Sequence, residues 1–102
     1  MSGFVKLATL EDIPPGSAKE VEHDGRIYAL FNVKGRITAI DGLCPHQGGP
    51  LADGHLEGDC VSCPWHGWEF DVRTGKSSMG SAMKQQVFNV KIEGSEILVQ
   101  IP

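Results

Sequence analysis

The chain is marked by two stretches of sequence, CPHQGGPL at residues 44–51 and CPWHGWEF at residues 63–70. Each places a cysteine close to a histidine, Cys44 with His46 and Cys63 with His66, and sixteen residues separate the two pairs. A chance arrangement of the chain's three cysteines and four histidines rarely produces this four-point pattern. The two pairs together therefore predict one metal site with four protein ligands.

Two thiolates and two imidazoles suit two kinds of metal site. They can bind one tetrahedral zinc ion, as in small modules whose folding depends on the ion. They also suit a two-metal cluster held between two loops, with the thiolates on one metal and the imidazoles on the other. Because strands are predicted on both sides of the pairs, the chain has less need of zinc for folding, and the cluster is favoured.

The sequence on either side of the pairs is typical of short antiparallel strands. Strand signals cover residues 4–8, 18–23, 26–33 and 36–40, and Asp24-Gly25 is a strong two-residue hairpin signal. Near the C-terminus, apolar and polar residues alternate over 88–92 and 97–101, on either side of a turn. Signals for helices are nearly absent. The sequence therefore predicts an all-β fold, a small antiparallel β-barrel or sandwich.

Length and composition narrow the classes of function. A chain of 102 residues predicts a single domain, and its net charge of −4 argues against binding to nucleic acid, which requires a basic face. No apolar run approaches the roughly 18–20 residues of a membrane-spanning helix. Residues 1–6 lack the apolar stretch of a secretory signal, so we expect a cytoplasmic protein with reduced cysteines and no membrane partner.

The two stretches resemble the cluster-binding segments of Rieske [2Fe–2S] proteins, and residues 52–54 and 71–75 are similar to that family as well. More narrowly, the chain looks like a Rieske-type ferredoxin, the small electron carrier of multicomponent ring-hydroxylating dioxygenases. The likeness is strong over residues 39–76. It implies the Rieske fold for residues 1–102, with a β framework of residues 1–41 and 84–102 and a loop-rich cluster-binding subdomain at about 42–80.

The resemblance also implies a role for each ligand. Cys44 and Cys63 would bind the inner iron of one [2Fe–2S] cluster per chain, and His46 and His66 the outer, solvent-facing iron. The residues expected around the cluster are Gln47, Gly48, Gly49, Trp65, Gly67 and Trp68. The glycines would let backbone N–H groups approach the sulfides, and the tryptophans would cover the cluster.

Three positions separate this chain from the Rieske subunits of respiratory complexes. In those subunits a disulfide joins the two loops at the positions that resemble Gly49 and Trp65, and a serine stands near the position of Trp68. Here the disulfide cannot form and the hydroxyl donor is missing, which indicates the low-potential branch of the family.

The third cysteine, Cys60, is expected to be a small packing residue on the strand entering the second loop.

The implied function is a one-electron carrier between a flavin-dependent ferredoxin reductase and a terminal oxygenase. The protein would not be an enzyme by itself, because 102 residues hold a cluster but no substrate pocket. Two alternatives remain open on the sequence. One is the small subunit of an assimilatory nitrite reductase, whose members resemble the same fold, and the other is a zinc-stabilised interaction module.

Overall fold

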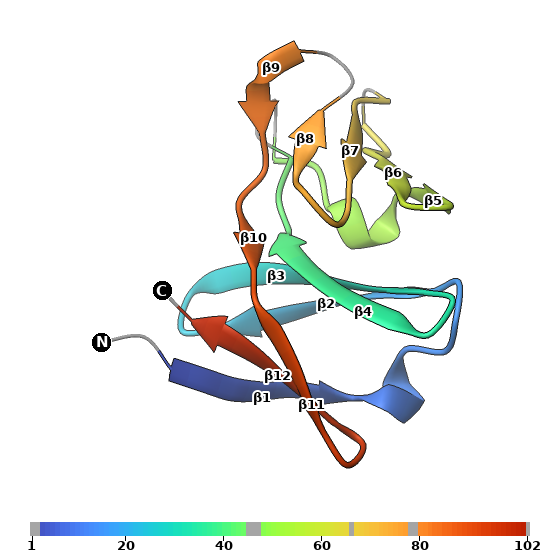
Figure 1. Cartoon of the computed structure of the whole chain (residues 1–102). Helices are drawn as coiled ribbons and strands as arrows, with labels where there is room; N and C mark the ends of the chain where they lie inside the picture. Colours follow the sequence, from blue (N-terminus) through green and yellow to red (C-terminus); the bar gives the residue numbers. More distant parts are fainter. Residues whose placement is uncertain (1–2, 45–47, 66, 78–79, 102) are drawn as a thin grey trace.

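The computed structural model describes residues 3–44, 48–65, 67–77 and 80–101 (Figure 1). Within these residues the chain forms twelve strands and two short 3-10 helices. The strands are β1 (Gly3–Thr9), β2 (Ala18–His23), β3 (Arg26–Val33), β4 (Arg36–Asp41), β5 (His55–Glu57), β6 (Cys60–Ser62), β7 (Glu69–Asp71), β8 (Lys76–Ser77), β9 (Gly80–Lys84), β10 (Val87–Phe88), β11 (Val90–Glu93) and β12 (Glu96–Ile101). The 3-10 helices are η1 (Leu10–Asp12) and η2 (Leu51–Asp53).

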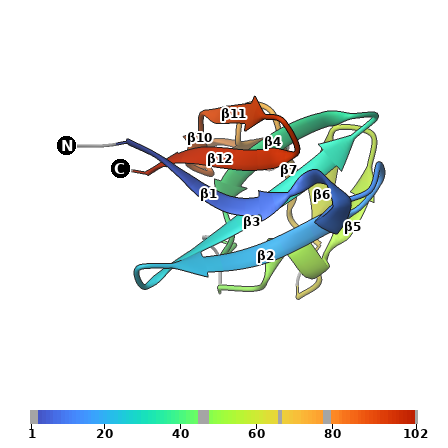
Figure 2. The same ribbon diagram turned by 90° about the horizontal axis from the view of Figure 1, so that it is seen from below.

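The strands form three antiparallel sheets, which confirms the predicted all-β antiparallel fold. The first has the order β1-β12-β11, the second β10-β4-β3-β2, and the third β5-β6-β7-β8-β9. The first two sheets make the base of the molecule, and the third lies at the opposite end (Figure 1). Seen from below, the three-stranded sheet covers the middle of the four-stranded one (Figure 2).

The five-stranded sheet is an insertion between two neighbouring strands of the base. The chain leaves the base at the end of β4 and returns at β10, and these strands pair through Val87 with Ile40 and Phe88 with Ala39. Both connections to the insertion therefore start from the same place in the base. This arrangement agrees with the loop-rich insertion expected from the sequence.

Two turns set the register of the central sheet. Asp24 and Gly25 join β2 to β3, and Lys34 and Gly35 join β3 to β4; all four residues have positive φ. This is the pattern of a two-residue type I′ turn, whose twist matches that of the strands it connects. The predicted hairpin at Asp24-Gly25 is confirmed, and a second one follows it.

β3 is buried on both faces and divides the core in two. Tyr28 and Leu30 face the lower core, together with residues of β1, β4, β10 and β12. Ala29 and Phe31, which alternate with them along the strand, face the upper core. The upper core joins the central sheet to the insertion; its buried residues are Ala29, Phe31, Ile40, Cys44, Leu51, Val61, Cys63, Phe70 and Val72.

The C-terminal hairpin is less evenly buried than its alternating pattern suggests. Ile97 and Val99 on β12 are fully buried, whereas Ile92 on β11 is 43% exposed. β12 is the middle strand of its sheet and β11 is an edge strand, so only β12 has neighbours on both sides.

Candidate metal centre

Two loops with the same pattern of backbone hydrogen bonds carry the two predicted cysteine ligands. In the first, the N–H of Cys44 donates to the carbonyl of Gly49 (2.8 Å), and the N–H of Gly48 donates to the carbonyl of Cys44 (2.7 Å). Gly48 has φ 75°, in the left-handed region where glycine carries no steric cost. The cysteine therefore begins a closed turn with a glycine at its fifth position.

The second loop repeats this pattern. The N–H of Cys63 donates to the carbonyl of Trp68 (2.7 Å), and the N–H of Gly67 donates to the carbonyl of Cys63 (2.9 Å). Gly67 has φ 73°, close to the value at the matching position of the first loop. The two cysteines thus occupy equivalent positions in two similar turns, as expected of loops that bind one object from two sides.

Both cysteines lie in the upper core. Cys44 and Cys63 are each 3% exposed, and neither forms a disulfide. Each is continuous with a well-anchored strand, because Cys44 follows β4 closely and Cys63 follows β6 directly. The sheets therefore hold two buried thiols without a covalent link between them, in an environment that excludes water.

The two loops touch at Gly49. A Cβ built on Gly49 would lie 2.7 Å from Sγ of Cys63 and 3.1 Å from Cγ of Trp65. The backbone of the first loop therefore approaches the sulfur of the second loop as closely as bare backbone allows. The contact also brings together Gly49 and Trp65, the two positions that resemble the disulfide positions of respiratory Rieske subunits.

The histidine half of the predicted ligand set lies outside the described residues. His46 and Gln47 belong to the undescribed part of the first loop, and His66 to that of the second. In the part of the chain that the structure describes, no three His, Cys, Asp or Glu side chains gather into a metal-binding group. The structure thus brings together the two cysteines, while the roles of His46 and His66 stay predictions.

The described residues fit a small iron–sulfur cluster. Thiolates are the ligands by which proteins hold such clusters, and two cysteines that form no disulfide are buried here in equivalent turns. The bare backbone at Gly49, against Sγ of Cys63, leaves space at the sulfur that a larger residue would fill. The donor set and the space around it therefore suit a cluster that the two loops hold jointly.

The two tryptophans differ in exposure. Trp65 is 56% exposed, and its ring lies beside Gly49. Trp68 is partly buried and packs against the upper core. Trp68 thus contributes to the apolar surroundings of the site, whereas Trp65 presents an aromatic surface to solvent at its edge.

Cys60 is separate from the two equivalent turns. It lies on β6, partly buried, opposite Asp71 of β7 and Glu57 of β5. Burial raises the pKa of the Cys60 thiol, and the negative charges of Glu69, Asp71 and Glu57 raise it further. A thiol that stays protonated is a poor metal ligand, which supports the expectation that Cys60 is a packing residue.

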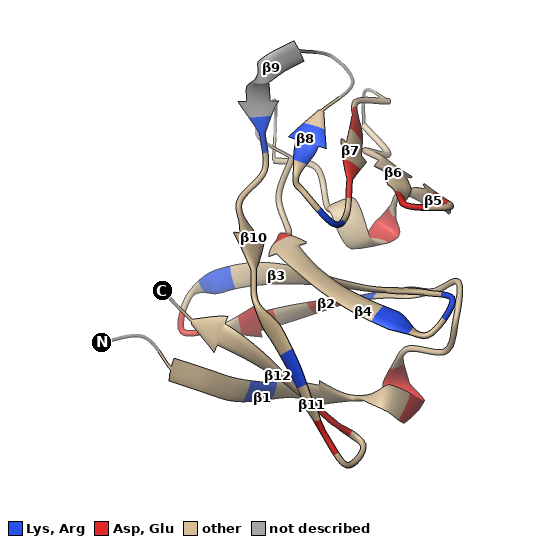
Figure 3. Ribbon diagram, in the orientation of Figure 1, with Lys and Arg blue, Asp and Glu red and all other residues tan. Residues whose placement is uncertain are grey.

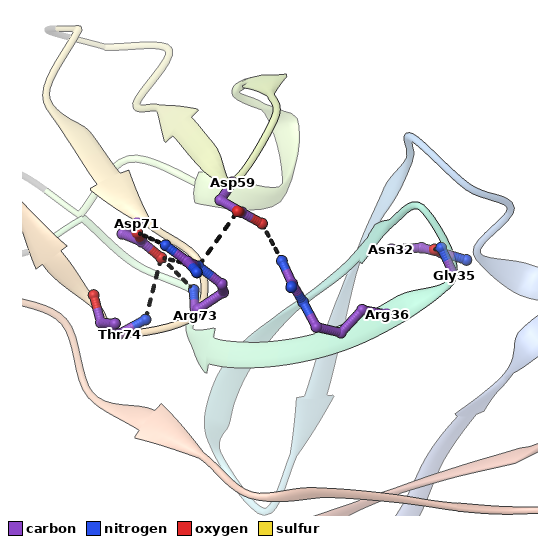
Figure 4. A network of polar contacts seen from close by, with 7 residues as sticks. All are labelled: Asn32, Gly35, Arg36, Asp59, Asp71, Arg73 and Thr74. Carbon is purple, nitrogen blue, oxygen red and sulfur yellow. Dashed lines mark hydrogen bonds and ion pairs between the residues drawn. The ribbon is translucent and has the colours of Figure 1, made fainter.

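An ion-pair network joins the insertion to the base (Figure 4). Asp59, in the turn between β5 and β6, pairs with Arg36 at the start of β4 and with Arg73 in the turn after β7 (3.3 Å). Arg73 also pairs with Asp71 (3.0 Å). Nothing in the sequence indicated the pair between Arg36 and Asp59, because 23 positions separate the two residues.

The carboxylate of Asp71 organises its own turn. It accepts hydrogen bonds from the backbone N–H groups of Arg73 (2.7 Å) and Thr74 (3.3 Å) and from the Arg73 side chain. Burial by itself raises the pKa of Asp71, but these hydrogen bonds outweigh it and hold the pKa below its ordinary value. This turn could have been predicted from the sequence, because an aspartate side chain often accepts hydrogen bonds from backbone N–H groups two and three residues ahead.

The match to a known family covers nearly the whole chain. Residues 3–99 match the Rieske [2Fe-2S] domain. The chain belongs to this family. The expected resemblance is thereby confirmed, and with it the [2Fe–2S] cluster as the cofactor of this kind of domain.

Similar proteins narrow the likeness to ferredoxin components. The biphenyl dioxygenase ferredoxin subunit of a Pseudomonas species is 39% identical to this Rieske domain over 94% of the chain and 90% of the relative. The ferredoxin component of the naphthalene 1,2-dioxygenase/salicylate 5-hydroxylase systems of a Ralstonia species is 37% identical over 96% of the chain and 95% of the relative. Both matches run nearly end to end, as expected of small single-domain carriers.

Solved structures give the same result for the fold. The ferredoxin of carbazole 1,9a-dioxygenase from Nocardioides aromaticivorans superposes with a TM-score of 0.86 and 30% identity, covering 94% of this chain and 95% of that one. A nitrite reductase small subunit from Mycobacterium tuberculosis has a TM-score of 0.89 over 100% of this chain and 97% of that one, but only 18% identity. The second likeness shows a shared Rieske fold and no more.

In the part of the chain that the structure describes, no helix is long and apolar enough to cross a membrane.

Proposed function

We propose that this Rieske ferredoxin is a one-electron carrier of an aromatic-ring dioxygenase system, with one [2Fe–2S] cluster per chain. The observation that carries the proposal is the nearly end-to-end similarity to ferredoxin components of biphenyl and naphthalene dioxygenase systems. Because those relatives are the ferredoxin components and not the oxygenases, this chain is an electron carrier and not the catalytic component. The cluster, when bound, accepts and releases one electron at a time.

Four residues would hold the cluster. The two buried thiolates, Cys44 and Cys63, bind one iron, and the imidazoles of His46 and His66 bind the other. The equivalent turns around Cys44 and Cys63 support the first half of this assignment, since each cysteine makes the same two backbone hydrogen bonds at the start of its loop. Residues 42–80 would form the cluster-binding subdomain on the β framework.

The residues around the ligands would control access to the cluster. Gly49 keeps bare backbone close to Sγ of Cys63, Gly48 and Gly67 provide the positive φ of the two turns, and Trp68 adds apolar cover. Gln47 lies beside His46 in the first loop and Trp65 beside His66 in the second. This cover lowers the local dielectric and limits access of water, which protects thiolate ligands and tunes the potential.

The partners would be a flavin-dependent ferredoxin reductase and a terminal oxygenase, in the cytoplasm. A solved complex of reduced oxygenase and oxidised ferredoxin in carbazole 1,9a-dioxygenase supports the second partner, since 94% of this chain matches one chain of it at 30% identity and a TM-score of 0.85. The exposed side chains of Trp65 and Leu43, on or next to the two loops, would offer an apolar contact there. Small contacts of this kind suit the brief encounters of electron carriers.

The metal content of the purified protein tests the proposal. We expect two irons and two acid-labile sulfides per chain, with visible absorption and a low average g value in the EPR spectrum of the reduced protein. Each of the variants Cys44→Ser, His46→Ala, Cys63→Ser and His66→Ala should lose the cluster. Stoichiometric zinc without iron, in protein produced with ample iron, would instead identify a zinc-stabilised module.

Cys60→Ser is the matched control for the cysteine variants. It removes a thiol three positions before Cys63 on the same segment. We expect this variant to keep its colour, its iron and its sulfide. A colourless Cys60→Ser protein would make Cys60 a ligand and overturn the assignment of four ligands.

A further inference from the structure

Gln85 is a buried polar residue at the point where the chain returns from the five-stranded sheet to the base. It lies between β9 and β10 and is only 4% exposed. Its side-chain amide donates hydrogen bonds to the carbonyl oxygens of Asp41 (2.8 Å) and Leu43 (2.5 Å). An amide that is buried without partners is costly, so these two bonds hold the side chain in one place.

Both acceptors belong to the segment that enters the first cluster-binding loop. Asp41 ends β4, and Leu43 directly precedes Cys44. The side chain of Asp41 also accepts a hydrogen bond from the N–H of Leu43 (3.2 Å). Gln85 is therefore bonded to the backbone on which the first cysteine is carried, one residue away from that cysteine.

The main chain of Gln85 is bonded to the part of the insertion that follows the second loop. Its N–H donates to the carbonyl of Gly75 (2.7 Å), in the turn after β7. A Cβ built on Gly75 would lie 2.0 Å from the carbonyl oxygen of Gln85, and Gly75 has φ +77°, so this approach requires glycine. β7 itself begins directly after the turn of Cys63.

We infer that Gln85 is a positioning residue that sets the placement of the two cluster-binding loops relative to each other. Its side chain holds the entry to the first loop, and its main chain holds the hairpin that continues from the second. The inference rests on the proposed cluster, because it concerns how firmly the two loops hold it. Gln85 acts through the backbone of residues 41–43 and of Gly75, and groups that orient metal ligands in this way affect metal retention.

The test compares Gln85→Met with Gln86→Met in the purified, cluster-loaded protein. Methionine matches glutamine in length and has no amide donors, so Gln85→Met removes both hydrogen bonds at little change of volume. Gln86 is the next residue, and its exposed side chain accepts one long hydrogen bond, of 3.4 Å, from Arg26. Loss of visible absorption is followed in the presence of an iron chelator, at a temperature where circular dichroism shows all variants to be folded.

We expect Gln85→Met to lose its colour about ten times faster than the unchanged protein, which corresponds to about 1.4 kcal/mol. Its reduced EPR spectrum should have broader lines, because loops that are held less firmly adopt a wider range of ligand geometries. Gln86→Met should match the unchanged protein in both measurements. Gln85→Asn keeps the donors on a shorter side chain and should lie between the two, which supplies a test even where Gln85→Met folds poorly.

Equal rates and equal line widths for Gln85→Met, Gln85→Asn and the unchanged protein would overturn the inference. Faster loss of colour only in parallel with global unfolding would also overturn it, since Gln85 would then act on stability and not on the loops. Failure of the proposed function would be a separate result, because the protein without any substitution would then contain no iron and no sulfide.

Discussion

Gly49 of the first loop lies against the sulfur of Cys63 in the second, so closely that a Cβ on Gly49 would be 2.7 Å from Sγ. This contact joins the two stretches that hold the predicted ligands. Any residue with a side chain would require the sulfur or the loop to move. Residue 49 therefore controls how closely the two loops approach each other.

Gly49→Ala should weaken the hold on the cluster. The new methyl group has to displace Sγ of Cys63 or separate the loops, and overpacking of this kind costs about 1–3 kcal/mol. We expect less iron and sulfide per chain than in the unchanged protein, measured by chemical analysis of material purified in parallel.

Gly58→Ala provides the control for this substitution. Gly58 has φ +61°, and nothing lies within 4 Å of a Cβ built on it. This variant therefore introduces backbone strain of about 1 kcal/mol away from the sulfur, and it should retain full iron content. Equal iron in both variants would show that the contact at Gly49 does not govern the cluster.

The ion pair between Arg36 and Asp59 should stabilise the fold modestly. Side-chain exposure is 50% for Arg36 and 34% for Asp59, so solvent screens the pair. A double-mutant cycle with Arg36→Ala and Asp59→Ala should give a coupling free energy of about 0.5–1 kcal/mol in urea unfolding. The coupling should fall as salt is added, since exposed charges are screened. A coupling that does not change between low and high salt would contradict a charge-based pair.

Asp71 should stabilise the protein near neutral pH and lose this effect in acid. Its pKa in the folded state lies below the ordinary value of 3.8, so its contribution to stability is complete above that value and is lost as pH falls through the folded-state pKa. Asp71→Asn removes this contribution, which we expect to be less than about 1 kcal/mol. The difference in unfolding free energy between the two proteins should therefore be largest near neutrality and shrink below pH 3.8. A difference that is constant with pH would assign the effect to lost packing.

The reduction potential should lie near the lower end of the Rieske range, at about −150 mV. Trp68 occupies the position that resembles that of the hydroxyl donor in respiratory Rieske subunits and has no hydroxyl, and Gly49 and Trp65 cannot form a disulfide. Oxidised iron bound by His46 and His66 would draw electron density from the two imidazoles and make their N–H groups acidic enough to lose a proton in alkaline solution. Reduction would hold these protons more tightly. The potential should be flat near neutrality and fall with pH above it. A slope of about 59 mV per pH unit already present at pH 6 would contradict this assignment.

The acidic residues expected around the cluster, here called the acidic rim, should affect the rate at which a partner protein docks. Figure 3 shows acidic residues on β5 and β7; the carboxylates expected near the cluster are Asp41, Asp53, Glu57, Asp59, Glu69 and Asp71. Asp41, Asp59 and Asp71 form ion pairs with arginines, which weakens the field of the rim. Reduction by the proposed reductase partner should therefore slow by a small factor above about 0.1 M salt.

Stopped-flow reduction over a range of salt concentrations measures this effect. A rate constant that is flat or rises with salt would exclude steering by charge. Docking would then depend on the apolar surface of exposed Trp65, Leu43 and Pro64.

The sequence by itself determined the family, the all-β fold class and which two of the three cysteines, Cys44 and Cys63, form the candidate site. Each depends on residues close together along the chain: the spacing within the two cluster stretches, the alternation of apolar residues, and the turn at Asp24-Gly25, which requires positive φ. Local patterns of this kind can be read because the geometry of a turn or a strand is set by a few neighbouring residues.

Only the tertiary structure decided which distant residues meet. Arg36 and Asp59 are 23 positions apart, and Gln85 and Leu43 are 42 apart, so neither contact leaves a periodic signal. A glutamine among polar neighbours also gives the pattern of an exposed residue, yet Gln85 is buried, because two carbonyl groups of a distant segment satisfy its amide. Its burial follows from how the segment between β9 and β10 packs against the entry to the first loop, and that packing depends on the whole fold.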